Sequence, residues 1–213
     1  GRGQPRAVEV AALQAGLDQL QRAAELAADR ADIALALATT HDQLAQSQEA
    51  LAYARQALTL GLSEQDQVVN AQFIAGRALY RQGDFRAAAD QLRAVLQARP
   101  SDPLTQMWAG LAAYQLADYT TAVGNFERAV QLNPNSVEAR ANLGAGYLAA
   151  QRYQEAETVY SLLVSQNERD FESLYNLGWA LFSQNRRGAA TEAWVSSCEL
   201  GYQPACSAIS TYL

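Results

Sequence analysis

A period of 34 residues runs through the sequence and restricts the possible folds more than any other feature. Four columns of residues keep this spacing: glycine at Gly76, Gly110, Gly144 and Gly178; alanine at Ala88, Ala122, Ala156 and Ala190; an aromatic residue at Phe85, Tyr119 and Tyr153; and proline at Pro100 and Pro134. A fixed period of about 20–50 residues is typical of proteins that stack one supersecondary unit many times. The period therefore predicts a stack of helix–turn–helix repeats.

Each column has a physical role in such a repeat. Glycine and alanine are small, so they let neighbouring helices approach closely. The aromatic residue follows the turn inside the repeat and wedges between the two helices, while proline cannot continue a helix and ends the repeat. A bulky column completes the pattern, and we expect it to fill the space between repeats: Leu92, Phe126, Tyr160 and Trp194.

The composition agrees with an all-α fold and narrows the partners. Ala, Leu and Gln dominate, which favours helix, and alternating runs of β-branched residues are nearly absent. The net charge of −6 and the pI near 4.8 give an acidic surface that repels phosphate backbones, so no nucleic-acid partner is expected. No apolar run approaches the roughly 20 residues needed to span a bilayer, so we expect no membrane span in this chain.

The segments NLGAGYLAAQRYQEAETVY and WAGLAAYQLADYTTAVGNFERAVQLNP resemble the tetratricopeptide repeat family. The resemblance implies an α-solenoid that coils into a right-handed superhelix, lined inside by the first helix of each repeat, helix A. The predicted organisation is an N-terminal half repeat at 1–30, a degenerate repeat with an insertion at 31–68, four repeats within 69–204 (69–102, 103–136, 137–170 and 171–204) and a capping helix at 205–213. The degenerate repeat has Ala38 in place of the glycine and four extra residues before the next repeat.

The register of each helix A places a set of residues on the predicted inner face, one turn apart: Phe73, Arg77, Tyr80, Arg81, Met107, Leu111, Tyr114, Ala145, Tyr175, Trp179 and Phe182. Together they form an apolar, aromatic groove, and large exposed apolar patches usually mark interaction surfaces. Small residues around Ala145 face Tyr175 and Trp179, which predicts room for a bulky ligand side chain. The alternative for each aromatic residue is packing against adjacent helices.

Polar residues on the same face carry two further hypotheses. Asn142 and Asn176 stand two residues before the repeat glycine, where the resemblance implies an amide that bonds the backbone of an extended peptide; the alternative is a solvated or helix-bonded amide. Arg77 and Arg81 can grip a ligand carboxylate, or can be balanced by Asp84 or neighbouring acids. The family's Lys/Asn/Arg clamp for a C-terminal carboxylate is missing, so no ligand of that type is expected.

The segment CELGYQPAC, from Cys198 to Cys206, resembles the cysteine-containing turn of Sel1-like repeats, which are relatives of the tetratricopeptide repeat. In those repeats two such cysteines form a disulfide across the hairpin, and helical hairpin geometry can bring the Cα atoms within bridging range. The alternative is a pair of inert, buried thiols. A bridge would staple the last helix and would indicate an oxidising compartment, such as a bacterial periplasm or the cell exterior, rather than the cytoplasm.

Residue constellations for catalysis or for cofactors are missing from the sequence. It has no HExxH, Walker, GxGxxG or GxSxG motif, and His41, the one histidine, stands at a column that is apolar in other repeats. We therefore predict no enzyme activity, no catalytic residue, no metal site and no cofactor. His41 is predicted to be a satisfied core or boundary residue.

Two hypotheses on function remain. The first is a scaffold that binds a partner protein or an extended peptide in the groove. The second is self-assembly, in which the terminal helices dock on copies of the chain or on other domains of a longer protein. No signal peptide is visible, and the first residues, GRGQP, resemble a truncation boundary, so it stays open whether a signal, an anchor or a domain preceded them.

Overall fold

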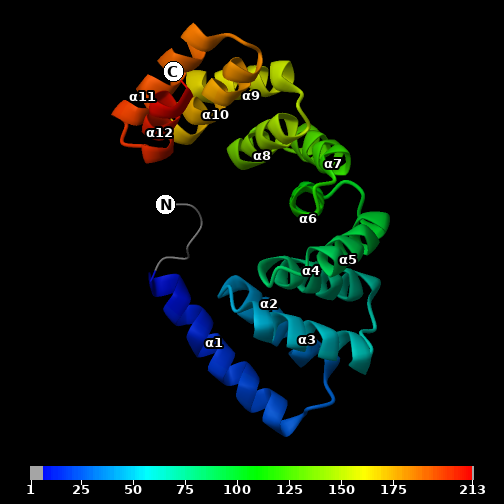
Figure 1. Ribbon diagram of the computed structural model, residues 1–213. Helices are drawn as coiled ribbons and strands as arrows, with labels where there is room; N and C mark the ends of the chain where they lie inside the picture. The colour runs from blue at the N-terminus through cyan, green and yellow to red at the C-terminus, as the bar shows by residue number, and fades with distance from the viewer. Residues whose placement is uncertain (1–6, 213) are drawn as a thin grey trace. The chain divides into compact units, whose positions relative to one another are not determined.

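A computed structural model describes residues 7–212, and every regular element in this range is an α-helix (Figure 1). The helices are α1 (Ala7–Leu26), α2 (Ala31–Gln43), α3 (Ser47–Leu60), α4 (Gln65–Arg81), α5 (Phe85–Ala98), α6 (Pro103–Gln115), α7 (Tyr119–Leu132), α8 (Val137–Ala149), α9 (Tyr153–Gln166), α10 (Phe171–Ser183), α11 (Arg187–Glu199) and α12 (Gln203–Tyr212). The predicted all-α fold is thereby confirmed. Within the described residues, none of the helices combines the length and the apolar character needed to cross a membrane.

The helices form two compact units, Gly1–Ser101 and Asp102–Leu213, and each is described by itself. Inside each unit every helix packs against the next one along the chain. The first helices of successive repeats also touch: α2 contacts α4 in the first unit, while α6 contacts α8 and α8 contacts α10 in the second. Within each unit, repeats therefore pack against their neighbours along the chain, which is the arrangement of a repeat protein.

The three-residue turn between helix A and helix B has the same construction in every repeat. After α4, Gly83 has a positive φ of 84°, its N–H donates to the carbonyl of Tyr80, and the N–H of Asp84 donates to that of Leu79. These two bonds are those of a Schellman motif, which satisfies carbonyls at the helix end. The equivalent residues of the other repeats take the same left-handed conformation without being glycine: Ala45, Ala117, Gln151 and Asn185. Packing between helices therefore overrides local preference at these turns.

The connectors from helix B to the next helix A are longer and end in capping residues. Residues 133–136 and 167–170 are such connectors; the hydroxyl of Ser136 and the carboxylate of Asp170 accept bonds from the first-turn N–H groups of α8 and α10. The four residues that interrupt the period, 65–68, form the first turn of α4. This helix accordingly has 17 residues, whereas α8 and α10 have 13 each.

The repeat glycines pack against the bulky column of their own repeat. A Cβ added to Gly76 would lie 2.8 Å from Leu92 Cγ, and one on Gly144 would lie 2.7 Å from Tyr160 Cζ. The bulky side chains therefore chiefly fill the space between helix A and helix B inside a repeat, not only the space between repeats. In the degenerate repeat, Ala38 and Ala54 occupy the two positions and both are fully buried, so a smaller helix B residue compensates for the larger helix A residue.

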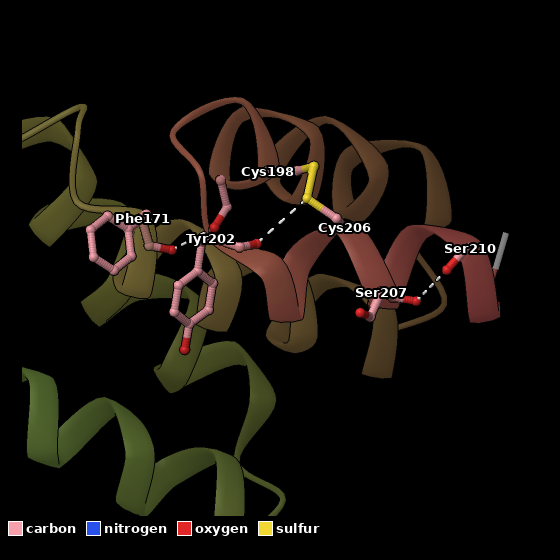
Figure 2. The surroundings of a disulfide bond; sticks show 7 residues. Phe171, Cys198, Tyr202, Cys206, Ser207 and Ser210 are labelled. Carbon is pink, nitrogen blue, oxygen red and sulfur yellow. Dashed lines mark hydrogen bonds between the residues drawn. A yellow bond between two sulfur atoms is a disulfide. The ribbon is translucent and has the colours of Figure 1, made fainter.

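The chain ends in a second tight hairpin, between α11 and α12 (Figure 2). Its turn has three residues, and Gly201 takes the left-handed conformation with the same pair of backbone bonds as the turns inside the repeats. A disulfide joins Cys198 to Cys206, with 4.9 Å between the Cα atoms. The bridge closes the hairpin, while α12 buries Ala205 and Ala208 against α10 and α11.

Candidate partner-binding face

The predicted inner-face residues of helix A are mostly half-buried, so they retain accessible surface. Met107 is the most enclosed, with 7% of its surface exposed. It lines a cavity of about 130 Å³ between the N-termini of α6 and α8 and the C-terminus of α7. The others are half-buried: Phe73, Arg77, Tyr80, Arg81, Leu111, Tyr114, Asn142, Ala145, Tyr175, Asn176, Trp179 and Phe182.

In the first unit the two arginines of the predicted face bind a carboxylate of the protein itself. Asp42, at the end of α2, is buried and accepts from Arg77 Nη1 at 2.9 Å and from Arg81 Nη1 at 2.7 Å. The acid proposed from the sequence, Asp84, instead caps α5 by accepting from the N–H of Ala87. Burial is the main cause that lowers the pKa of the Arg77 guanidinium; Asp42 opposes the shift and Arg81 adds to it.

The inner-face aromatic residues near the end of each helix A pack against the aromatic column that follows the turn inside the repeat. The ring of Tyr80 lies 5.3 Å from that of Phe85, and the ring of Tyr114 lies 5.5 Å from that of Tyr119. Where the last repeat has Arg187 in this column, its guanidinium lies over the ring of Phe182 at 5.7 Å. One side of Tyr80, Tyr114 and Phe182 is therefore used for packing inside its repeat.

Much of the aromatic surface of α10 is covered by the C-terminal hairpin. Trp179 contacts the rings of Trp194 and Tyr212, each at 5.2 Å, and Phe182 contacts the same two rings at 5.5 Å. Trp179 and Phe182 therefore pack against adjacent helices on one side, as the alternative interpretation of the sequence held, and they remain accessible on the other side. The hairpin therefore leaves less of the Trp179 and Phe182 side chains exposed than the sequence alone indicated.

Two further residues extend the aromatic surface and were missed in the sequence. The ring of Tyr202, from the turn before α12, stacks on Phe171 at 5.1 Å and meets Tyr175 edge-on at 5.3 Å. Figure 2 shows the rings of Phe171 and Tyr202 side by side, on the side of the turn away from the disulfide. Phe171 is 40% exposed, which is high for a phenylalanine in a packed repeat. The repeat period offered a signal for Phe171, because the equivalent residue 34 positions earlier, Val137, is also apolar and exposed.

The two asparagines lie on neighbouring helices and keep their amides available. Asn142 is on α8 and Asn176 on α10, and these helices contact each other. Both side chains are half-buried, and neither amide has a hydrogen-bond partner among residues 7–212. An amide carries both donors and an acceptor, so two of them in adjacent repeats can bond the backbone of one extended segment.

The sequence has one histidine, His41, and two cysteines, Cys198 and Cys206. His41 is buried, stacks on Tyr53 at 5.3 Å and donates from Nδ1 to Gln46 Oε1 at 2.6 Å, while its Nε2 has no partner in the described residues. The histidine is therefore in the core, as predicted, but only half satisfied. Both cysteines form the disulfide, and no group of ligating side chains within 7–212 is suited to hold a metal ion.

Comparison with known proteins agrees with this architecture. Family models described as the tetratricopeptide repeat match residues 35–103, 73–137 and 113–177. No curated protein sequence matches the chain. The similarity of residues 198–206 to Sel1-like repeats stays a prediction, because the matched segments end before it.

Solved structures share the fold at low sequence identity. YrrB, described as a tetratricopeptide repeat protein with an unusual peptide-binding site, is 21% identical with a TM-score of 0.77, over 90% of this chain and 97% of its own. MamA from Desulfovibrio magneticus RS-1 is 18% identical with a TM-score of 0.72, over 81% and 96%. The family models together span residues 35–177, so the chain belongs to the tetratricopeptide repeat family, whose members are protein-interaction scaffolds.

Proposed function

We propose that residues 102–213 bind an extended segment of a partner protein along the inner faces of α6, α8 and α10. The observation that carries this proposal is that Asn142 and Asn176 lie on contacting helices and that neither amide has a hydrogen-bond partner in the described part of the chain. The segment's backbone bonds these amides, and its side chains contact the half-buried apolar residues beside them.

The surroundings of the two asparagines support a ligand with at least one bulky apolar side chain. Ala145 is a small residue about one turn after Asn142 on α8, while Leu111 on α6 and Trp179 on α10 are half-buried apolar residues of the helices that contact α8. An apolar groove with a few placed polar groups is the usual composition of a ligand site. YrrB, which shares the fold, is described as having a peptide-binding site, and this is consistent with such a use of the fold.

Peptides selected from a random ten-residue phage library on the immobilised chain provide the probe. Replacing both asparagines, Asn142→Ala with Asn176→Ala, is expected to weaken binding of a selected peptide about tenfold or more, because each lost hydrogen bond costs roughly 1 kcal/mol. Calorimetry measures the dissociation constants. Asn125→Ala, on helix B α7, is the matched control and should leave affinity unchanged. A library that yields no binder, or a double variant that binds like the wild type, overturns the proposal.

We propose in addition that the protein works in an oxidising compartment, such as a periplasm or the cell exterior. The pairing of Cys198 with Cys206 supports this, because disulfides persist where thiols are not kept reduced. Thiols are counted under denaturing, non-reducing conditions in protein recovered from its native host. No free thiol is expected, and two free thiols per chain would contradict the proposal.

A further inference from the structure

A cluster of three rings and one carboxylate lies at the first turn of α10, where the C-terminal hairpin meets the inner face. We name it the aromatic–acid patch; it comprises Phe171, Glu172, Tyr175 and Tyr202. We propose that this patch binds the positively charged side chain of an arginine or lysine in the partner segment. The inference rests on the function proposed above and specifies the chemistry of its ligand.

The rings supply a platform of the kind that attracts cations. Tyr202 lies between Phe171 and Tyr175, stacked on the first ring and edge-on to the second. Phe171 is 40% exposed, so surface of its ring stays open to solvent beside the packed pair. The face of an aromatic ring is the negative pole of its quadrupole, and a guanidinium or ammonium group within about 6 Å of its centre is attracted to it.

Glu172 adds a full negative charge to this platform. Burial is the first cause that raises the pKa of the Tyr202 phenol, and the carboxylate of Glu172 is the second, which places that carboxylate within electrostatic reach of the ring. By its spacing of three and four residues, Glu172 shares the inner face of α10 with Tyr175 and Asn176. A cation on the patch therefore meets a ring face and a carboxylate together.

The inner face of the whole second unit has the same sign. By the helical register, α6, α8 and α10 each have six positions on this face. These positions are six, three and two residues before the column glycine and one, four and five residues after it. The acidic residues at these positions are Glu138 and Glu172, and none of the positions holds an arginine. No arginine of the described residues pairs with Glu138. Residues 102–213 contain six arginines against eleven acidic residues, whereas residues 1–101 contain ten against eleven. Charge complementarity thus favours a basic partner for this face.

A competing explanation is that Glu138 and Glu172 only stabilise their helices. Both stand in the first turn of a helix, where a carboxylate interacts favourably with the helix dipole. That role affects the stability of the fold and does not discriminate between ligands. The two roles are therefore separated by measuring affinity and stability on the same variants.

The test compares matched peptides from the random library. Selected sequences are expected to be enriched in arginine or lysine, and replacing that arginine by citrulline, its uncharged isostere, should weaken binding about five- to tenfold. In Glu172→Gln the loss on citrulline substitution should shrink to about twofold or less, and Phe171→Leu should reduce it in part. The control Glu192→Gln removes the same charge from the exposed side of α11. In this variant, citrulline substitution should weaken binding as much as it does in the wild type.

The outcomes separate this inference from the function on which it rests. If no peptide is selected, the proposed function itself fails. If peptides bind but lack basic residues, or if citrulline binds as well as arginine, the cation site is wrong and the peptide groove stands. If Glu192→Gln reduces the arginine effect as much as Glu172→Gln does, net charge alone explains it and the patch is refuted.

Discussion

The inner faces of the two units carry different polar groups and engage them differently. In the first unit, Arg77 and Arg81 of α4 are held by Asp42 of α2, so the charges of this face are engaged inside the protein. In the second unit the positions of Arg77 and Arg81 hold Ala145 and Ala149 on α8 and Trp179 and Ser183 on α10. Other inner-face positions of these helices hold Glu172 and the two asparagines, whose amides have no hydrogen-bond partner among residues 7–212. The comparison indicates that the inner face joins neighbouring repeats in the first unit, and we propose that it presents groups to a ligand in the second.

The largest effect that tests this comparison is expected from replacing Asp42, the acid that binds both arginines of the first unit. Asp42→Asn leaves two guanidiniums around an uncharged amide, and breaking a buried ion pair from one side costs about 3–5 kcal/mol. In the second unit, Glu172→Gln should cost below about 1 kcal/mol, since a first-turn acid contributes little. Urea denaturation followed by far-UV circular dichroism measures both.

Asp66→Asn is the control for this experiment, because it removes an exposed partner of Arg99 whose ion pair contributes about 0–1 kcal/mol. Equal losses for Asp42→Asn and Asp66→Asn would show that the inner-face network of the first unit is not structural.

The second change tests what holds the aromatic surface of the second unit in place. Cys198 and Cys206 bracket Tyr202 symmetrically, four residues on either side. For a loop of this length, replacing both cysteines by serine should cost about 2.5 kcal/mol. Tryptophan fluorescence during urea denaturation follows this unit specifically, because Trp108, Trp179 and Trp194 all lie in it.

Selected peptides should also bind this double serine variant more weakly, because the disulfide no longer restrains the turn that carries Tyr202. The control is the wild-type protein without reductant. A variant with unchanged stability and affinity would mean that packing of α12, and not the bridge, positions the ring.

The third change probes the packing beneath the two faces. A Cβ at Gly178 would overlap the ring of Trp194, which is fully buried and donates from Nε1 to the carbonyl of Tyr175 at 3.1 Å. Gly178→Ala is therefore expected to destabilise the second unit by about 2 kcal/mol through overpacking. The first unit tolerates Ala38 at the equivalent place because Ala54 stands opposite.

Gly124→Ala is the control on α7, where an added Cβ has nothing within 4 Å and should stabilise the helix by about 0.5–1 kcal/mol. The change in unfolding free energy of both variants is measured by tryptophan fluorescence in urea. A change of the same sign for both would exclude overpacking as the cause of the Gly178→Ala effect.

The sequence predicts the helices well and the contacts between repeats less well, for reasons that specific residues illustrate. The columns that include Gly144 and Tyr160 are local to one repeat, so their period alone locates the helices. The partner of Arg77 could not be predicted, because Asp42 belongs to the degenerate repeat, where the four extra residues shift the register. Tyr202 falls two periods after Pro134, where the repeat pattern predicts a four-residue connector, whereas a three-residue turn carries its ring onto Phe171.

The smallest expected effect concerns the column three residues after the repeat glycine, which holds His41 in the first unit and Tyr147 in the second. Tyr147 is buried, donates to Glu127 Oε1 at 2.8 Å and has Arg152 over its ring at 4.5 Å. Burial, followed by the bond to Glu127, raises the pKa of Tyr147 from 10.0 to about 12. The folded state therefore favours the protonated phenol.

This shift stabilises the protein fully below pH 10, and the contribution is lost as the pH rises toward 12, because the unfolded chain loses the proton first. The difference in unfolding free energy between the wild type and Tyr147→Phe should accordingly shrink by about 1–2 kcal/mol between pH 9 and pH 12, as both are measured in urea. Tyr119→Phe, outside the described hydrogen bonds, controls for general alkaline effects. A wild-type advantage that stays constant over this range would show that burial and Glu127 together do not hold the phenol protonated, and that Tyr147 acts mainly through packing.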